Sequence, residues 1–548
     1  MFETTTMGPR GEPLPCPHLV MRPDAPPPNP LATSIIMGQM QFSVPEPARE
    51  FFDACHWSDA YLCGIEGVPW PSRNSFQNDQ LIIQRSVDSS AKLHITCPVP
   101  ELGYRVLTTC SLRCDARPHR FLLELARGSC YRVRVQSDTW QRGGLALSDR
   151  FDELLQSGTQ AFLDVASNWD DSPDTTKRTL VALAHLESAA DELGSLFAEQ
   201  SIAFRRKRET RLTTMLAAGI VPSAPSEPSA SETLADRVPA LNQFSQSFNA
   251  AAIRMSWGDI QQDSGELDFQ DVEESVAACQ AQGLRIIGGP LVDQREGLCP
   301  DWLALFDDRF DKLVETMTSF LEKTVTHFRG RVNLWNAATA LNTAGPLKLD
   351  DEQVMHLSIT ALQTIRRCDP TTPVVISLDQ PCGEYLSRDQ NGISPLHFAD
   401  ALLRSGLGLA GIGLNFRFGF AQHATSPLST MDFGQTLDRW GTLNAPLMVQ
   451  LSVAGAPGND DLARLKTETY PMSLQLNGDA DAWADWQNRF AGPLIRTLLA
   501  KPIVHAIVWE SWSDQHPHVS PHSGLLDSSG KQRPLLDSVT TLRKELLS

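Results

Sequence analysis

The sequence predicts an α/β protein: a (β/α)8 TIM barrel preceded by a β-rich, sandwich-like or jelly-roll-like N-terminal module and a helical connector. Strand-like segments separated by turn residues fill residues 34–150, and two helical stretches follow at 151–211. From residue 212 to residue 548, eight strand-like segments alternate with helical ones. Such alternation is typical of a parallel sheet with helices outside it, and eight repeats can close a barrel.

The N-terminal residues divide into a tail and a module. Residues 1–33 contain the proline-rich run Asp24–Pro30, so we expect a poorly ordered tail there. The module at 34–150 has β-branched or alternating segments that predict strands at Leu81–Val87, Lys92–Val99, Tyr104–Leu112 and Tyr131–Gln136. A short helix is expected at Phe121–Gly128. Modules of this kind often bind sugars, although the fold alone does not establish that role.

The connector at 151–211 has helical periodicity. Its second helix places apolar side chains three and four residues apart on one face: Leu183, Leu186, Ala190, Leu193 and Phe197. The helix ends in the basic run Arg205–Arg208. A nucleic-acid or targeting patch is one interpretation of this run. We prefer the other, because positive charge is favoured at any helix C-terminus.

The barrel strands are predicted from aliphatic and β-branched runs bounded by turn residues. They are Thr214–Val221, Ala250–Trp257, Leu284–Val292, Val332–Thr339, Pro373–Asp379, Leu409–Phe416, Pro446–Val453 and Ile503–Glu510. Helices are expected between them, among others at Asp307–His327, Asp351–Arg367 and Asp481–Ala500. The Ser/Pro-rich segment Pro222–Glu232 follows the first strand and predicts a flexible insert near the functional rim.

Composition narrows the class of function. A net charge of −18 and a pI near 5.2 argue against nucleic acid and anionic membranes as partners, because phosphate groups require a basic surface. No apolar stretch approaches the roughly 20 residues of a membrane span. The N-terminus lacks a secretory pattern, and the 11 cysteines have neither disulfide nor zinc-site spacing. We expect a cytoplasmic protein without a cofactor, with export by an unrecognised route as the alternative.

Several segments of the region 212–548 follow one another in a recognisable order. They are RMSWGDIQQDSGELDFQ, LRIIGGPLVDQ, CPDW, HFRGRVNLWNAATA, RRCDP, GIG, VWESWSD and GLLD. In this order they resemble glycoside hydrolase family 10, whose familiar members are endo-β-1,4-xylanases. The resemblance implies a barrel that binds a β-glycan at its C-terminal rim and cleaves it with two glutamates.

The chain departs from the family at the residues that cleave the sugar. The general acid aligns with Ala340 and the nucleophile with Gln450. Other motif positions are also replaced, and the residues found there are Ala252, Ile253, Ser256, Gly289, Asp293, Gln294, Thr339, Asn415, Arg417 and Ser452. A retaining glycosidase needs two carboxyl groups about 5–5.5 Å apart. Alanine has no proton to donate and glutamine is neutral, so we expect no hydrolysis by the family mechanism.

Other acids could take over the reaction. Four carboxyl side chains follow predicted strands and belong near the C-terminal rim, where barrel enzymes bind their substrates: Asp293, Asp379, Glu510 and Asp514. Asp293 and Glu510 are the preferred members of a relocated catalytic pair, because they stand directly at strand ends. For Asp379 and Asp514, capping or ion pairing within loops is the alternative interpretation.

Sugar binding is expected from a small set of rim residues. They are Trp257, Asn415, Gln450, Trp509 and Asp514. Indole rings can stack on pyranose C–H groups; Trp512 is a further candidate for that role, whereas Trp335 is assigned to the core. The run His516–His522 could offer three imidazoles to a metal ion. Its prolines favour a solvated rim segment instead, so we assign no metal site.

Two functions from different classes follow. The preferred one is a pseudoenzyme of xylan or β-glycan metabolism that binds a polysaccharide or oligosaccharide, or acts as a scaffold, without cutting it. The alternative is an active β-glycosidase that uses relocated carboxylates. The barrel mouth distinguishes the enzyme from the scaffold: two acids facing each other across a cleft favour the enzyme, and a filled or purely apolar mouth favours the scaffold.

Overall fold

The computed structural model describes residues 38–222, 241–261, 265–306, 309–388, 392–476 and 478–547. The chain divides into two compact units, Met1–Ile36 and Met37–Ser548, and everything described below belongs to the second. The predicted tail at 1–33, and the predicted insert Pro222–Glu232 beyond its first residue, lie outside the described residues. No helix in the described ranges is long and apolar enough to cross a bilayer.

The N-terminal module contains two four-stranded sheets, which confirms the predicted β-rich region. The first sheet has the order β4-β5-β1-β8, with bounds Arg73–Gln77, Gln80–Arg85, Gly38–Ser43 and His119–Arg120. The second has the order β3-β2-β6-β7, with bounds Pro69–Trp70, Tyr61–Cys63, Lys92–Val99 and Gly103–Thr108. Side chains of both sheets share one hydrophobic cluster, to which Phe42 and Leu81 contribute from the first sheet and Leu62 and Leu93 from the second. Both sheets therefore contribute to one hydrophobic core, which also includes the helical residues Phe52 and Phe121.

The predicted strand Tyr131–Gln136 is wrong. The segment lies inside helix α2 (Phe121–Arg142), which is far longer than the predicted short helix. Gly128 does not end the helix: a Cβ there would lie 1.8 Å from the carbonyl oxygen of Thr108, so this glycine lets α2 approach β7 closely. Along the segment only Val133 is fully buried, and Tyr131 and Val135 are exposed, which is the spacing of one helix face rather than a strand.

The predicted helical connector is present as two helices, α3 (Asp149–Ser167) and α4 (Pro173–Arg206). Each begins at a serine N-cap whose hydroxyl accepts a backbone N–H, Ser148 for α3 and Ser172 for α4. The long helix α4 packs against α2 and α3 on the module side and against α12 and α13 of the barrel. Arg205 in its basic C-terminal run is buried and donates to the carbonyl of Leu499, so it helps to fix the helix to the barrel.

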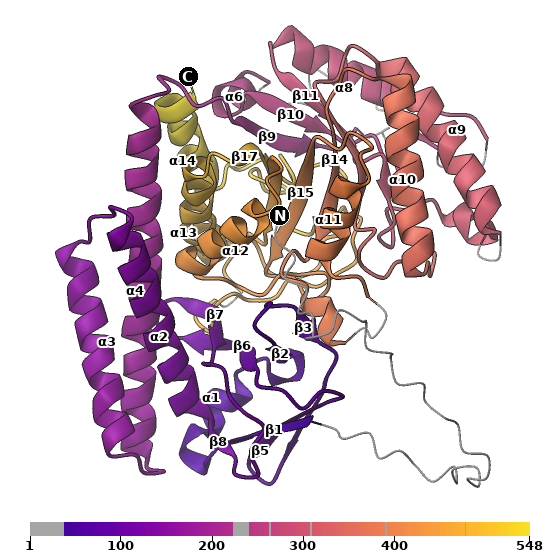
Figure 1. Ribbon diagram of the computed structural model, residues 1–548. Helices are drawn as coiled ribbons and strands as arrows, with labels where there is room; N and C mark the ends of the chain where they lie inside the picture. The colour runs from indigo at the N-terminus through magenta and orange to yellow at the C-terminus, as the bar shows by residue number, and fades with distance from the viewer. Residues whose placement is uncertain are drawn as a thin grey trace, which may run out of the picture. The chain divides into compact units, whose positions relative to one another are not determined.

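The rest of the chain forms a closed parallel barrel, as predicted (Figure 1). Its strands are β9 (Met215–Ile220), β10 (Ala250–Ile253), β11 (Arg285–Gly288), β12 (Val292–Asp293), β13 (Leu334–Thr339), β14 (Val374–Asp379), β15 (Gly411–Phe418), β16 (Leu447–Val453) and β17 (Val504–Trp509). The strands β11 and β12 together occupy the third of the eight barrel positions, since each pairs with β13. Pairing of β17 with β9 closes the ring.

Helices lie between the barrel strands along the chain, and the last of them, α14, follows the final strand β17. They are α6 (Leu241–Ser247), α7 (Trp257–Ile260), α8 (Gln270–Ala281), α9 (Phe310–Phe328), α10 (Asp351–Cys368), α11 (Pro395–Arg404), α12 (Thr430–Gly441), α13 (Ala480–Ala500) and α14 (Pro534–Leu542). Shorter helical segments are α1 (Arg49–Asp53), η1 (Glu46–Ala48), η2 (Trp57–Asp59), η3 (Asp301–Phe306), η4 (Glu384–Ser387) and the π-helical η5 (Arg543–Leu547).

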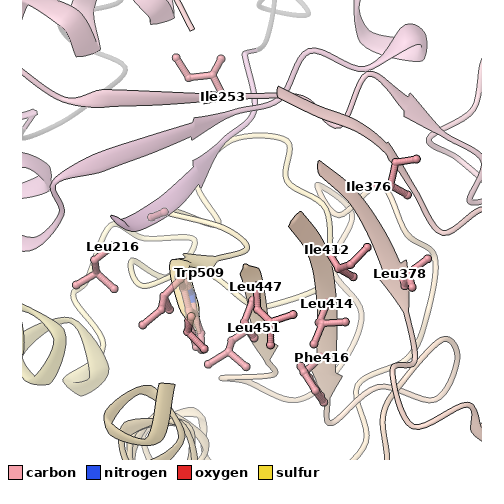
Figure 2. Packing of buried hydrophobic residues seen from close by; sticks show 14 of the residues in the cluster. Leu216, Ile253, Ile376, Leu378, Ile412, Leu414, Phe416, Leu447, Leu451 and Trp509 are labelled. Carbon is pink, nitrogen blue, oxygen red and sulfur yellow. The ribbon is translucent and has the colours of Figure 1, made fainter. Parts of the chain in front are cut away.

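Alternation along the strands decides which side chains reach the barrel interior. One set of strand residues forms a separate inner cluster, in which Ala217, Ala250 and Ala506 leave room for larger neighbours. The intervening residues, among them Leu216 and Leu451, belong to the large outer cluster that packs against the helices, part of which Figure 2 shows. Continuing the inner register toward the C-terminal ends of the strands leads to polar residues, and these form the barrel mouth.

Candidate functional site

The two positions that correspond to the family's glutamates contribute no charge to the mouth. Ala340 follows β13 directly, is completely buried, and has a left-handed backbone with φ of 59°. Its carbonyl accepts a hydrogen bond from Gln294 Nε2 at 3.0 Å. Gln450 points inward from β16, and its Nε2 donates to Glu510 Oε1 at 3.1 Å.

Asp293, a candidate for the relocated pair, is held by two arginines. Arg295 binds it through two side-chain hydrogen bonds of 2.9 and 2.7 Å, and Arg254 Nη2 lies 3.1 Å from the same carboxylate. Burial raises the pKa of Asp293, but the charges and hydrogen bonds of Arg295 and Arg254 outweigh it and lower the pKa to about 2. A general acid must hold a proton near neutral pH, so this environment suits a permanently charged carboxylate.

Glu510 and Asp379 belong to the same buried network. Arg295 Nη1 lies 4.0 Å from Glu510 Oε1 and 3.8 Å from Asp379 Oδ2. Arg417 Nε lies 3.8 Å from Glu510 Oε1. One guanidinium, that of Arg295, therefore contacts three carboxylates, including both members of the proposed relocated pair. Arg254 also pairs with the buried Asp259 at 2.8 Å, and Arg464 contacts the same acid, so the network contains four arginines and four acids.

Little open space remains at the centre of the mouth. The cavity lined by Arg254, Arg295, Gln450 and Glu510, among other residues, has a volume of about 40 Å³. A water molecule takes about 30 Å³ in the liquid, whereas ligand pockets span about 300–1,000 Å³. The cavity can hold water but not a sugar ring. The mouth is thus filled by an arginine–carboxylate network, and no open cleft separates the two candidate acids.

The tryptophans predicted to stack on sugar are in the core. Trp509 is 3% exposed and lies in the outer cluster beside Leu447 and Leu451 (Figure 2), with its Nε1 donating to the carbonyl of Ser523. It points outward because strand residues alternate, and its neighbour Glu510 points inward. Trp257 is 2% exposed and stacks on Phe320. Neither indole offers a face to a ligand.

Two other tryptophans considered from the sequence, Trp335 and Trp512, are also buried. Trp335 is completely buried, and its Nε1 donates to Asp369 at 3.1 Å, which confirms its assignment to the core. Trp512 is 5% exposed and packs edge-on against Phe244 and Phe248. This residue therefore offers no stacking surface in the mouth.

The three polar binding candidates are all bound to neighbouring residues: Gln450 donates to Glu510, and Asn415 and Asp514 have partners of their own. Asn415 Nδ2 donates to Asp379 Oδ1 at 2.6 Å and to Thr339 Oγ1 at 2.7 Å. Asp514 is completely buried, accepts the backbone N–H of Gly524, and pairs with Arg533 at 2.7 Å. The alternative interpretation of Asp514 as a paired loop residue agrees with this geometry.

The histidine run contributes to a buried charged cluster. Among the described residues, Asp460, Asp514 and His518 could together hold a metal ion, since their ligand atoms lie within 4.8 Å of one another. His518 Nε2 lies 2.9 Å from Asp460 Oδ2 and 3.5 Å from Asp514 Oδ1. Burial lowers the pKa of His518, but the hydrogen bond to Asp460 and the charge of Asp514 outweigh it and raise the pKa. The imidazole of His518 thus lies against both acids.

Sequence reasoning did not identify a second cavity of about 870 Å³ at the outer rim. Its walls come from the N-terminal module, which contributes His56 and Tyr104, and from barrel loops, which contribute Gln380, Glu384 and Tyr470. The local sequence gives only a weak signal, namely polar and aromatic residues just after the strands β14 and β15. The contact between module and barrel that encloses the cavity has no sequence signature.

Comparison with known proteins gives a likeness of fold. No family model matches the sequence, and neither does any curated protein. Xylanase 10B from Thermotoga petrophila RKU-1 is 14% identical, covers 64% of this chain and 97% of its own, and has a TM-score of 0.44. Native xylanase 10B from Thermotoga maritima is 14% identical, with shares of 62% and 98% and a TM-score of 0.45.

A third structure, of a GH10 protein from Paenibacillus barcinonensis, is 14% identical, covers 62% of this chain and 98% of its own, and has a TM-score of 0.44. These structures are of xylanases or GH10 proteins, the kind of protein that the sequence motifs resemble. At such identities and TM-scores the likeness concerns the barrel fold alone and does not extend to the residues of the mouth.

Proposed function

We propose that this protein is a catalytically inactive relative of family 10 glycoside hydrolases that binds a polysaccharide or oligosaccharide without cutting it. The observation that carries the proposal is the Arg295 guanidinium, which contacts Asp293, Asp379 and Glu510 in the place where a hydrolase needs an open pair of carboxyl groups. Ala340 and Gln450 at the two glutamate positions support the same conclusion.

The chemistry of glycoside cleavage gives this observation its weight. Cleavage needs a proton donor on one side of the glycosidic bond and a nucleophile or activated water on the other. General acid help alone contributes about 10²–10⁴-fold. A carboxylate with a pKa of about 2 does not supply that proton at neutral pH. A mouth with about 40 Å³ of free space also leaves no room for the sugar.

The competing proposal is an active β-glycosidase in which Asp293 and Glu510 form the catalytic pair. It would require both side chains to leave Arg295, which would expose a buried cation and separate ion pairs at a cost of several kcal/mol. A protein–protein scaffold without affinity for sugars is the other competing proposal, and only binding experiments separate it from the preferred function.

Titration calorimetry against β-glycan oligosaccharides tests the proposal. We expect saturable heat with at least one of xylohexaose, cellohexaose and mannohexaose, and no product in the cell afterwards by mass analysis. Absence of heat with every probe would remove the glycan-binding role and favour the scaffold. Shortened products would favour the glycosidase.

A further inference from the structure

The rim cavity of about 870 Å³ is enclosed by two parts of the chain that are far apart in sequence. Backbone hydrogen bonds hold these parts together: Tyr104 N donates to Met472 O at 2.8 Å, and Val106 N donates to Pro427 O at 2.8 Å. The outer edge of strand β7 is thereby hydrogen-bonded to loops of the barrel. Because the walls are joined through the backbone, the cavity is preformed, as ligand sites usually are.

One wall of the cavity is aromatic. The His56 ring lies 4.8 Å from the Tyr104 ring and 4.7 Å from the Tyr470 ring, which meets it edge-on at 90°. Tyr470 is 38% exposed although it is a large aromatic side chain. Burial and the charge of Asp59 act in opposite directions on His56, and burial prevails, so its pKa is lowered and the ring is neutral at pH 7. A neutral aromatic wall suits the C–H face of a sugar ring.

Four residues that line the cavity, one of them His56 of the aromatic wall, carry a polar atom without a partner. His56 Nε2, Gln380 Oε1, Glu384 Oε2 and Thr425 Oγ1 are buried, and none of them has a hydrogen-bond partner among the described residues. Each belongs to a residue that lines the cavity. Leaving such an atom unpaired costs about 1–3 kcal/mol, so a native protein usually satisfies it with water or a ligand. Two acceptors, a hydroxyl and an imidazole together match the hydroxyl groups of a carbohydrate.

The charged groups around the cavity do not favour an anionic ligand. Asp59 and Glu384 line it, and its cation Arg388 is already paired with Asp59 at 3.2 Å. An anion would need an unpaired guanidinium or ammonium group to bind it. His423 also lines the cavity, but burial lowers its pKa and keeps it neutral. A neutral, hydroxyl-rich ligand is therefore favoured.

Burial raises the pKa of Glu384 to about 7, against smaller opposing effects from backbone hydrogen bonds and Arg388. The other titratable groups near this carboxyl are Tyr61 and Cys63 of β2 and Cys382 of its own loop. Burial raises the pKa values of all three, so they stay neutral at pH 7. Near neutral pH the carboxyl group of Glu384 can therefore be protonated, and its O–H can donate a hydrogen bond to a hydroxyl oxygen of a ligand.

We propose that this rim cavity is a binding site for a neutral oligosaccharide, completed by His56 and Tyr104 of the N-terminal module and lined on the barrel side by Glu384 and Tyr470. The inference rests on the proposed glycan-binding function and gives it a location. It moves the sugar away from the closed centre of the barrel and makes the module part of the site.

Calorimetry with xylohexaose, cellohexaose and mannohexaose tests the location. For the probe that binds the wild type, we expect Tyr470→Ala and His56→Ala to weaken affinity roughly tenfold, which corresponds to the loss of one aromatic contact. Tyr131→Ala, an exposed aromatic of α2 outside this cavity, is the matched control and should bind normally. Equal affinity of all three variants with the wild type would overturn the inference and leave glycan binding intact.

Hydrogen exchange of the wild-type protein gives an answer that does not depend on the folding of variants. Saturating oligosaccharide should slow exchange in residues 380–388 and 419–427 of the barrel and in 55–59 of the module. Protection confined to other regions would overturn the inference. Absence of binding by every probe would overturn both the location and the proposed function. Release of shortened products with normal dependence on Tyr470 would keep the location and overturn the non-hydrolytic function.

Discussion

Replacement of Arg295 by methionine is the most informative perturbation of the barrel mouth. Methionine keeps much of the side-chain volume but leaves the buried carboxylate of Asp293 with Arg254 as its remaining cation. The pKa of Asp293 should then rise from about 2 to its ordinary 3.8 or above, because burial is no longer outweighed. Each pKa unit corresponds to about 1.4 kcal/mol, so at pH 7 the loss of stability from this carboxylate alone is about 2.5 kcal/mol.

The two other acids that contact Arg295 add to this loss. Breaking a buried ion pair by removing one partner typically costs about 3–5 kcal/mol, and we expect Arg295→Met to fall in this range. Urea unfolding at pH 7, followed by tryptophan fluorescence, measures the change. Arg404→Met is the control, since Arg404 is exposed, pairs only with Asp400 one turn away, and should lose about 0–1 kcal/mol. A loss no larger than that of the control would refute the role assigned to the network.

Three further predictions concern other residues. The double variant Ala340→Glu/Gln450→Glu should release no reducing ends from xylan, because the mouth stays closed by arginines; measurable turnover would contradict this. Glu384→Gln should raise the free energy of unfolding by about 3 kcal/mol at pH 8 and hardly change it at pH 4. Protonation of Glu384 stabilises the fold fully below about pH 4.5, and this stabilisation is lost as the pH rises through about 7. Equal effects at both pH values would contradict the prediction. Trp509→Ala should cost about 3–5 kcal/mol of stability by leaving a core cavity, seen as a lower melting temperature, and an unchanged melting temperature would contradict its burial.

The barrel was predictable because its local signals agree with one another. Strand β14 is predicted within one residue, since aliphatic residues run up to the polar Asp379 and a proline precedes the strand. Helix α10 begins with a capping box in which Asp350 and Gln353 exchange hydrogen bonds, a pattern that belongs to helix starts. Such features depend on neighbours in the sequence, so they can be found without the fold.

The N-terminal module shows where local signals fail. Tyr131–Gln136 alternates basic and apolar residues, as a half-exposed strand does, yet it continues helix α2. The decisive contact is that of Gly128 with the backbone of Thr108, which allows the helix to pass close to β7 instead of ending. A contact between segments 20 residues apart cannot be inferred from the period of either one.

The sequence predicted which acids lie at the barrel mouth but not which residues they contact. The sequence places Asp293 and Glu510 at strand ends, and both are at the mouth. It does not show that Arg295, two residues from Asp293, also contacts Glu510, because these two residues are far apart in the sequence. Trp509 and Glu510 are neighbours at the end of β17, so their side chains point to opposite sides of the barrel wall. The sequence places both near the rim but does not show that Trp509 is the one that points outward into the core. The rim cavity requires the packing of module against barrel, which no local pattern encodes.

Reducing-end release from xylan by the purified protein decides whether the barrel mouth is closed to catalysis. We expect a rate indistinguishable from that of a preparation carrying Asp293→Asn and Glu510→Gln together, because neither acid takes part in cleavage. Sustained release by the wild type that disappears in the double variant would contradict it, since the arginine network would then have to open and free both acids for catalysis.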